Sequence, residues 1–307
     1  MENSKIEWCD HTFNPWIGCC KISEGCKNCY AEKIAKRFYK QAQWGKNEKR
    51  ILTSDSYWKQ PLKWNRKAGA ENKRKKIFCA SMADVFDESV SDSWRDRIFS
   101  LVKDTQNLDW LILTKRPENA LHYFNYNTIK GNLIPWNAWI GVTVENQKEA
   151  NERIPLLLKI QASMRFLSCE PLLSEINFYE TSGFMPEKNH PWRNVPILTG
   201  IDWVICGGET GRDARPCHPH WIRKIKEQCI HSNVAFFFKQ WGEYMPLTNE
   251  IKPENINSIR FFNMNMERDK SSFPFYSAWK MNGAKNNILD GREWNQFPLT
   301  NNREECL

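Results

Sequence analysis

The stretch CCKISEGCKNCYA, residues 19–31, spaces Cys19, Cys26 and Cys29 as C-x6-C-x2-C. Two cysteines at C-x2-C reach one metal centre from a single turn, and glycines beside the motif ease the turn that brings in the third. Three thiolates on a four-iron cluster would leave one iron without a protein ligand. The spacing therefore indicates a metal centre, for which a 4Fe-4S cluster is one interpretation.

Structural zinc is the alternative interpretation of this motif. Cys9, His11 and Cys20 lie close enough along the chain to complete a tetrahedral site with Cys26 and Cys29. Buried cysteines without any ligand are the third reading. The eleven cysteines are odd in number and lack the even spacing of a disulfide framework, so in a reducing compartment the cluster of cysteines indicates metal binding or catalysis.

Short apolar runs farther along the chain have the length and composition of buried strands. They are residues 77–80, 110–113, 139–144, 165–168, 203–206 and 235–238. Helical periodicity lies between some of them, at residues 92–102 behind the capping residue Ser91, at 149–158 and at 221–230. Strands that alternate with helices predict a parallel sheet.

The predicted fold is α/β, a partial or complete parallel (β/α) barrel over residues 1–247, with the cysteine loop after its first strand. A doubly wound open sheet is the alternative. Composition changes near residue 247, where the chain becomes polar and rich in Asn. We predict that residues 248–307 form a C-terminal extension packed on the barrel.

Positive charge is concentrated in one part of the chain. The net charge is +8, yet residues 33–76 alone carry fifteen Lys and Arg against three acidic residues. This basic insertion contains Trp44, Trp58 and Trp64 and ends in the run Lys73, Arg74, Lys75 and Lys76. Basic groups with aromatic neighbours suit a phosphate backbone and exposed bases, so we predict a nucleic-acid contact beside the barrel mouth; a solvated surface is the alternative.

Charged residues also follow the predicted strands. In a (β/α) barrel the carboxyl ends of the strands meet at one mouth, where ligands bind. We therefore expect a shared site formed by Asp84, Lys115, Glu145, Glu170, Glu209 and Lys239. His218 and His220 flank a proline at a helix start, and we expect them to cap that helix or lie on the surface rather than to bind a ligand.

Several motifs together resemble a known family. They are NPWIGC (14–19), CKNCYA (26–31), SMADVF (81–86), LTKRP (113–117), GVTVEN (141–146), FLSCEPL (166–172), GGE (207–209), FKQWG (238–242) and LDGREW (289–294). The chain is identified by them as a member of the phage-associated three-Cys-motif family of radical-SAM-like proteins. It is similar, more distantly, to the spore photoproduct lyase branch of radical-SAM enzymes.

The resemblance implies a radical-SAM-type barrel enzyme that carries a 4Fe-4S cluster on Cys19, Cys26 and Cys29. S-adenosylmethionine would be its co-substrate and a nucleic acid or nucleotide its substrate. Asp84 or Glu209 would then hold the ammonium or ribose of S-adenosylmethionine, whereas Lys115 and Lys239 would hold a carboxylate or a phosphate. Glu170 lies in the same predicted site.

The resemblance has two departures and one further implication. The first cysteine gap is six residues rather than the usual three, and the Gly-Gly-Glu segment at 207–209 follows a late strand, so residues 81–84 occupy its usual place. A three-Cys-motif partner protein is also implied. The alternative function is a non-catalytic, cluster- or zinc-stabilised nucleic-acid-binding module that works with an effector in a phage or defence setting.

The sequence gives no sign of membrane insertion. It contains no run of about 18 apolar residues, and its polar start MENSKIEW lacks the apolar core of a signal peptide. We therefore expect a cytoplasmic protein without a membrane partner.

Overall fold

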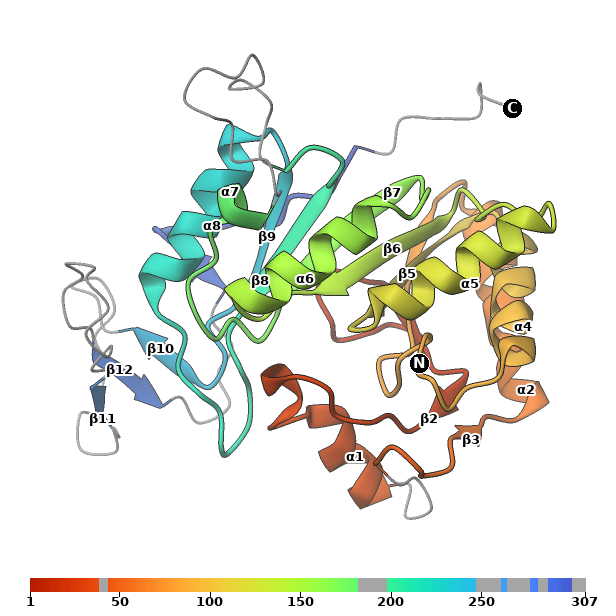
Figure 1. Cartoon of the computed structure of the whole chain (residues 1–307), viewed down its shortest axis with the longest axis horizontal. Helices are drawn as coiled ribbons and strands as arrows, with labels where there is room; N and C mark the ends of the chain where they lie inside the picture. Colours follow the sequence, from red (N-terminus) through yellow and green to blue (C-terminus); the bar gives the residue numbers. More distant parts are fainter. Residues whose placement is uncertain (39–43, 182–197, 247–260, 264–276, 281–286, 300–307) are drawn as a thin grey trace.

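The structure is a computed structural model that describes residues 1–38, 44–181, 198–246, 261–263, 277–280 and 287–299. Strands and helices alternate along most of the chain (Figure 1). The helices are η1 (Glu24–Cys26), α1 (Tyr30–Phe38), α2 (Asp55–Trp58), α3 (Gln60–Ala70), α4 (Asp92–Lys103), α5 (Pro117–Ile129), α6 (Gln147–Leu158), α7 (Phe178–Thr181) and α8 (Pro219–His231).

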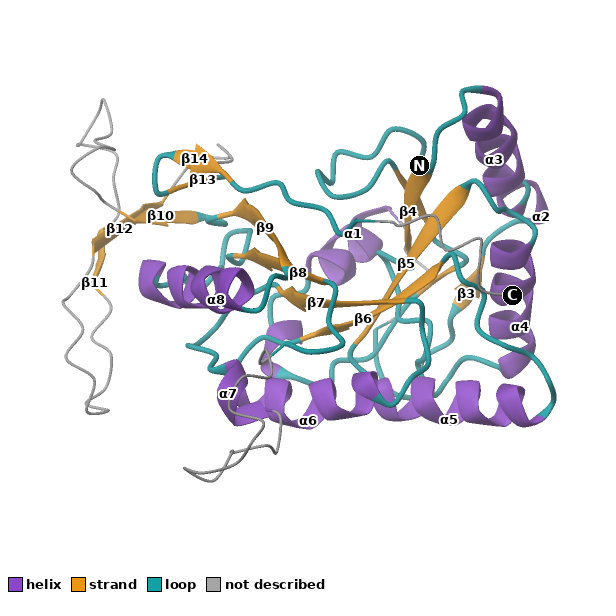
Figure 2. Ribbon diagram, turned by 90° about the horizontal axis from the view of Figure 1, so that it is seen from above, coloured by secondary structure: helices purple, strands orange, loops and turns teal. Residues whose placement is uncertain are grey.

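Seven strands form one parallel sheet in the order β1-β4-β5-β6-β7-β8-β9. Their bounds are β1 (His11–Phe13), β4 (Lys75–Cys79), β5 (Leu108–Thr114), β6 (Ala138–Thr143), β7 (Met164–Cys169), β8 (Trp203–Gly207) and β9 (Ala235–Gln240). Each strand pairs with the next one in the sheet without any reversal of order, so the doubly wound alternative is wrong. The sheet curls into a half-barrel with helices around its outer side, which confirms the predicted partial barrel (Figure 2).

The two faces of the sheet bury different residues. The outer face packs against the helices in a large core that includes Val142, Val204 and Trp221. The inner face begins with an aromatic layer, in which Trp203 of β8 lies 6.1 Å from the Phe237 ring and 6.1 Å from the Phe166 ring, measured between centroids. Trp8 from the N-terminal segment fills this layer, 4.6 Å from Phe78.

The polar residues of the inner face lie one layer above the aromatic residues. Side chains of a strand alternate between its two faces, so residues two positions farther along share a face. Ser168 follows Phe166, and Lys239 follows Phe237. Both line the pocket at the carboxyl edge of the sheet, together with Phe78 and Trp8. The half-barrel therefore has an apolar floor and a polar mouth.

Side chains cap helices α6 and α8, whereas Ser91, the predicted cap of α4, occupies the capping position without a capping hydrogen bond from its side chain. Helix α6 is capped by Asn146, whose side chain accepts a hydrogen bond of 3.0 Å from Glu149 N. His218 caps α8 in the same way, because its Nδ1 accepts from His220 N at 3.1 Å. The predicted capping role of His218 is therefore confirmed. Burial lowers the pKa of His218 to about 4, which keeps Nδ1 available as an acceptor.

Smaller antiparallel sheets accompany the half-barrel. Strands β2 (Trp16–Ile17) and β3 (Ile51–Leu52) pair beside the cysteine loop, and β10 (Tyr244–Pro246), β12 (Ser277–Lys280) and β11 (Phe261–Asn263) form a second sheet. Strands β13 (Ile288–Leu289) and β14 (Arg292–Glu293) form a hairpin. Beyond this hairpin the chain runs antiparallel to β9, where Phe238 N donates to Trp294 O and Gln296 N donates to Phe236 O.

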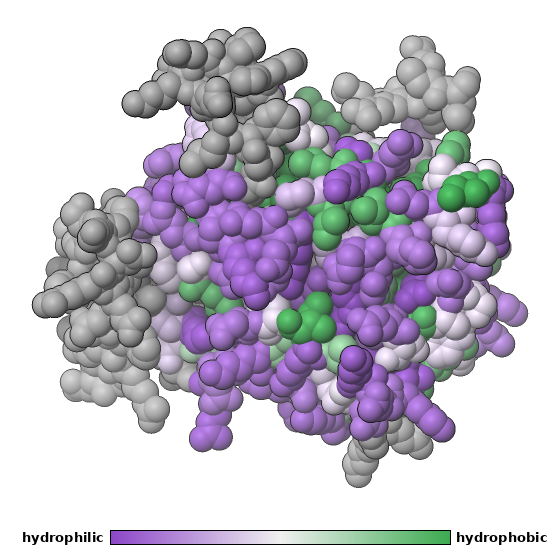
Figure 3. All heavy atoms as spheres, in the orientation of Figure 1, coloured by the Kyte–Doolittle hydropathy of each residue, from purple (hydrophilic) through white to green (hydrophobic). Residues whose placement is uncertain are grey.

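The outer surface is mostly polar. Figure 3 shows a largely hydrophilic face with hydrophobic residues in small patches, as is usual for the exposed side of helices packed on a sheet. Among the described residues, none of the helices has both the length and the apolar character needed to cross a membrane.

Candidate functional site

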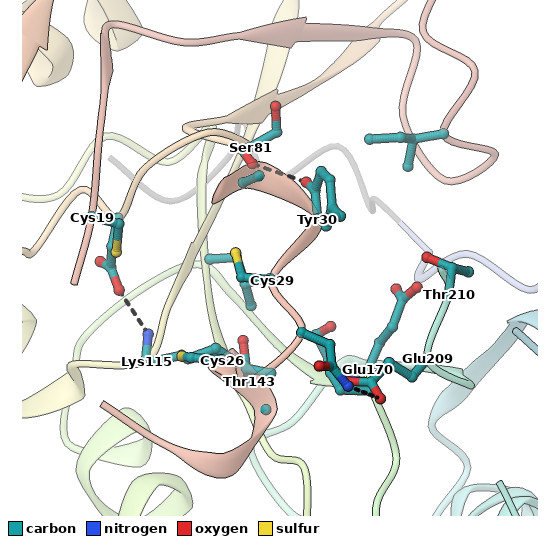
Figure 4. Close-up of a pocket in the computed structure, with 18 of the residues that line it drawn as sticks. Cys19, Cys26, Cys29, Tyr30, Ser81, Lys115, Thr143, Glu170, Glu209 and Thr210 are labelled. Atoms are coloured by element: carbon teal, nitrogen blue, oxygen red, sulfur yellow. Dashed lines mark hydrogen bonds between the residues drawn. The ribbon is translucent and has the colours of Figure 1, made fainter. Parts of the chain in front are cut away.

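A cavity of about 560 Å³ opens at the carboxyl edge of the half-barrel. The predicted cysteines Cys19, Cys26 and Cys29 all line it, as Figure 4 shows. Of the six charged strand-end residues, five line it as well, namely Asp84, Lys115, Glu170, Glu209 and Lys239. Glu145 does not line the cavity but contacts one of these residues, Lys115.

The cysteine loop is held against the sheet by its own backbone. Gly18 N donates to Met82 O at 3.2 Å, in a bridge to the segment that follows β4. Gly18 has a φ of 115°, a conformation that side chains disfavour. Cys29 N then donates to Cys26 O at 3.3 Å, which closes the turn between these two cysteines at the start of α1. The loop therefore presents its cysteines to the cavity from a fixed position.

Arg116 lies beside the first cysteine and was not predicted. Its Nη1 is 3.8 Å from Cys19 Sγ, and its Nη2 is 2.9 Å from the sulfur of Cys20, a fourth thiol that lines the same cavity. Burial and the charge of Asp84 raise the pKa of Cys19, and Arg116 opposes them. Burial also raises the pKa of Cys29.

Asp84 holds Arg116 in place. One carboxylate oxygen accepts from Arg116 Nη1 and from Lys115 N, each at 3.0 Å, and the other accepts from Thr114 Oγ1 at 2.7 Å and from Phe86 N at 2.9 Å. Asp84 is only 5% exposed. Its hydrogen-bonding capacity is thus largely used within the protein.

Glu145 anchors the cysteine loop from below. Lys115 Nζ is 2.5 Å from one of its oxygens, Arg153 Nη1 is 2.8 Å from the other, and Ser23 Oγ donates to the first at 2.8 Å. Burial alone would raise the pKa of Glu145, but these two cations outweigh it and the pKa is lowered. A Cβ on Gly25 would lie 2.3 Å from the same carboxylate oxygen, so this loop position has room only for glycine.

Glu209 anchors the other side of the loop. Its carboxylate accepts from Arg215 Nη2 at 2.6 Å, from Arg215 Nε at 2.9 Å and from Asn28 Nδ2 at 3.0 Å. Burial raises the pKa of Glu209, and the hydrogen bonds from Arg215 and Asn28 lower it by more. Because Asn28 lies between Cys26 and Cys29, this network fixes the C-x2-C turn.

Glu170 and Lys239 form an ion pair across strand β8. Lys239 Nζ lies 2.5 Å from Glu170 Oε1, and each side chain is 18% exposed. Gly207 of β8 lies between them, with the site of its missing Cβ 3.5 Å from Glu170 Cδ. The pair therefore passes over β8 at Gly207, and both of its residues line the cavity.

Two residues of the zinc alternative considered above, His11 and Cys9, lie outside the cavity lining. His11 packs against the Trp64 ring at a centroid distance of 4.7 Å, and its Nδ1 accepts from Asn3 N at 3.1 Å. Cys9 packs in the aromatic layer instead of the cavity wall. Within the described part of the chain, no three Cys, His, Asp or Glu side chains are close enough for one metal ion. The thiols that line the cavity, and could hold a metal group there, are those of Cys19, Cys20, Cys26 and Cys29.

The basic run lies at the opposite edge of the sheet. Lys73 to Lys76 precede or begin β4, whereas the cavity lies at the carboxyl ends of the strands, so this part of the basic insertion does not lie beside the mouth as expected. Arg74 pairs with buried Asp109 at 2.5 Å, and Lys75 lies 3.3 Å from Asp10. Lys76 Nζ is 4.7 Å from the centroid of the Phe297 ring.

The tryptophans of the basic insertion are largely core residues. Trp58 and Trp64 are each 4% exposed, and both pack in the core between sheet and helices. Neither is therefore available to stack on an exposed base.

The family follows from comparison with known sequences. Residues 3–298 match the model of a family described as protein of unknown function DUF5131. The chain belongs to DUF5131. A comparison with curated proteins gave no match.

Solved structures similar to this DUF5131 protein are variants of spore photoproduct lyase. One variant has a TM-score of 0.45 and 9% identity, over 92% of this chain and 71% of that one. A second, with bound AdoMet and dinucleoside spore photoproduct, has a TM-score of 0.45 and 8% identity over the same shares.

Proposed function

We propose that this DUF5131 protein is an iron–sulfur enzyme of radical-SAM type that acts on a nucleic acid or nucleotide. The observation that carries the proposal is the convergence of Cys19, Cys26 and Cys29 on one cavity at the carboxyl edge of a half-barrel. A cavity of about 560 Å³ falls within the usual range for cofactor and substrate sites.

The three thiols would hold a 4Fe-4S cluster after losing their protons. When bound, such a cluster supplies an electron and an open iron for the amino and carboxyl groups of S-adenosylmethionine. The raised pKa values of Cys19 and Cys29 mean that cluster binding must release protons, so loading should improve with rising pH. Arg116 would offset thiolate charge and donate toward Cys19 Sγ.

The polar residues of the mouth divide into two groups. Asp84, Lys115 and Glu209 each have strong partners within the protein, so we propose that they act mainly by holding Arg116 and the cysteine loop in position. Glu170 faces the cavity with fewer partners and is the best placed of the four to contact a ligand. Cofactor binding by these residues stays a prediction.

Two partner predictions are retained as proposals. A three-Cys-motif partner protein rests on family resemblance alone. A nucleic-acid contact at Lys73, Arg74, Lys75 and Lys76 would lie at the edge of the sheet away from the cavity, and three of these side chains already contact other residues. We therefore place the substrate at the mouth rather than at this run.

The test is anaerobic reconstitution with iron and sulfide, followed by incubation with S-adenosylmethionine and dithionite. We expect a brown protein with about four irons per chain and formation of 5′-deoxyadenosine. Alanine at Cys19, Cys26 or Cys29 should remove the iron, whereas Cys20→Ala, the matched control, should retain it. One equivalent of zinc and a colourless protein would refute the proposal. A loaded cluster without 5′-deoxyadenosine would favour the non-catalytic binding module.

A further inference from the structure

The ion pairs of the mouth differ in how much hydrogen-bonding capacity they leave. The carboxylate of Glu145 pairs with two cations and accepts a hydrogen bond from a hydroxyl. The carboxylate of Glu209 accepts hydrogen bonds from Arg215 and Asn28. Glu170, in contrast, receives one described hydrogen bond, from Lys239. An ammonium has three donors and a carboxylate has two acceptor oxygens, so this pair still presents a donor and an acceptor side by side to the cavity.

Aromatic and apolar side chains form the floor of the same cavity. Trp8 is 3% exposed and lines the cavity, whereas its Nε1 is itself buried and is not offered to a ligand. Phe78, 4.6 Å from Trp8, and Leu113 complete this apolar floor. A flat ring would suit this surface.

The charges that line the cavity cancel. Four lining residues are cationic and four are anionic: Lys5, Lys115, Arg116, Lys239, Asp84, Glu170, Glu209 and Glu243. The whole chain, in contrast, carries +8. A phosphate deep in the cavity would meet no excess of positive charge, so the part of the substrate that enters beside S-adenosylmethionine should be uncharged but polar.

We propose that Glu170, Lys239 and Trp8 form the subsite that recognises the substrate, and that the group bound there is a nucleobase. The carboxylate accepts from a ring N–H or exocyclic amine, the ammonium donates to the neighbouring carbonyl or ring nitrogen, and the ring lies on the aromatic floor. The neutral edge of a nucleobase can bind in this way while the Glu170–Lys239 ion pair stays intact. A zwitterionic amino acid would instead have to separate the two charges. This subsite deepens the proposed function and rests on it for the reaction that follows.

Direct binding measurements test the subsite without any need for activity. Uridine, guanosine, cytidine, adenosine and S-adenosylmethionine are titrated calorimetrically into the anaerobic full-length protein, with ribose 5-phosphate as the negative probe. At least one nucleoside other than adenosine should bind and ribose 5-phosphate should not. Glu170→Gln or Lys239→Met should weaken that nucleoside roughly 10- to 100-fold, the usual effect of losing a hydrogen bond to a charged group.

A matched control and a charge exchange separate recognition from folding. Glu175 and Lys224 form a partly exposed ion pair away from the cavity lining, so Glu175→Gln and Lys224→Met should leave nucleoside binding unchanged. The double variant Glu170→Lys with Lys239→Glu keeps an ion pair but exchanges donor and acceptor, so it should change which nucleoside binds best. A mixed-sequence single-stranded oligonucleotide identifies the source of the base. If the oligonucleotide binds more tightly than the nucleoside, the substrate is a nucleic-acid strand. If it binds equally or more weakly, the substrate is a free nucleoside.

Three results would overturn the subsite. The first is that the parent protein binds no nucleoside. The second is that the double variant with exchanged charges binds the same nucleosides as the parent. The third is that variants of Glu170 and Lys239 weaken only adenosine and S-adenosylmethionine, which would assign the pair to the cofactor. Iron content is measured on the same samples. If the protein holds iron but binds no nucleoside, the subsite is refuted and the proposed function stands. If the protein holds no iron but binds nucleosides through Glu170 and Lys239, the subsite stands and the proposed function is refuted.

Discussion

Replacing Glu145 by Gln tests whether the buried network beneath the cysteine loop stabilises the fold. Glu145 has no exposed surface, and its carboxylate neutralises Lys115 and Arg153. Gln keeps the shape but removes the charge, which leaves Lys115 without its acidic partner and Arg153 with Glu149 alone. Breaking a buried pair in this way costs about 3–5 kcal/mol.

The loss in the free energy of unfolding can be converted into a change in Tm. Unfolding entropy of about 2.1 cal/mol/K per residue gives roughly 0.6 kcal/mol/K for a chain of 307 residues. Glu145→Gln should therefore lower Tm by roughly 5–8 °C in calorimetry or circular dichroism. Adding Lys115→Met should recover part of the loss, since one unpaired cation disappears. Glu152→Gln, in an exposed pair on α6, the helix that carries Arg153, should change Tm little.

The pH dependence gives an independent check. Burial acts to raise the pKa of Glu145, but Lys115 and Arg153 bring it below its ordinary value of 4.5. The stabilisation is therefore complete above that value and is lost as pH falls through the lowered pKa. The Tm difference between parent and Glu145→Gln should shrink in acid. A difference below about 2 °C at neutral pH, or one that is independent of pH, would refute the reasoning.

Three further predictions concern other positions. The pKa of His218 is about 4 in the folded protein, whereas its ordinary value is 6.5, so the free energy of unfolding should fall by up to about 3 kcal/mol as pH drops from 6.5 to 4. His218→Asn, which keeps a capping acceptor, should abolish this dependence, measured by urea unfolding at a series of acidic pH values. Gly25→Ala should displace the loop from Glu145, lowering stability by about 1–3 kcal/mol and reducing iron retention after reconstitution; unchanged iron and Tm would contradict the close approach. Arg74→Glu should destabilise the protein by about 3 kcal/mol or more because it places a carboxylate against buried Asp109, whereas Lys73→Glu, at an exposed position, should not; equal melting of the two would show that the Arg74 pair is not structural.

The sequence predicted the main strands because each is an apolar run of ordinary strand length. All six predicted strands are present, including residues 110–113 within β5 and 203–206 within β8. Strand β1 was not predicted individually, because three residues carry too little periodicity. Helix α5 was also missed, since asparagines interrupt its apolar spacing.

The site was predictable in position but not in pairing. Carboxyl ends of parallel strands meet at one edge, which is why Asp84, Lys115 and Glu170 could be expected together. Arg116 and Arg215 were missed, although Arg116 directly follows a residue that the strand-end rule selects. Which carboxylate an arginine reaches depends on side-chain direction, and strand order alone does not set that direction. The basic run was misplaced because local charge density carries no information about the edge of the sheet on which it lies.

The segment at residues 294–297 has a consequence for self-association. An exposed edge strand offers unpaired N–H and C=O groups to another chain, which favours domain swapping and fibre growth. In this protein the β9 edge is occupied by residues 294–297 through Phe238 and Phe236, and the opposite edge, β1, is only three residues long. Neither edge offers a long template. If two copies associate, the seven-stranded sheet should therefore not continue from one copy into the other.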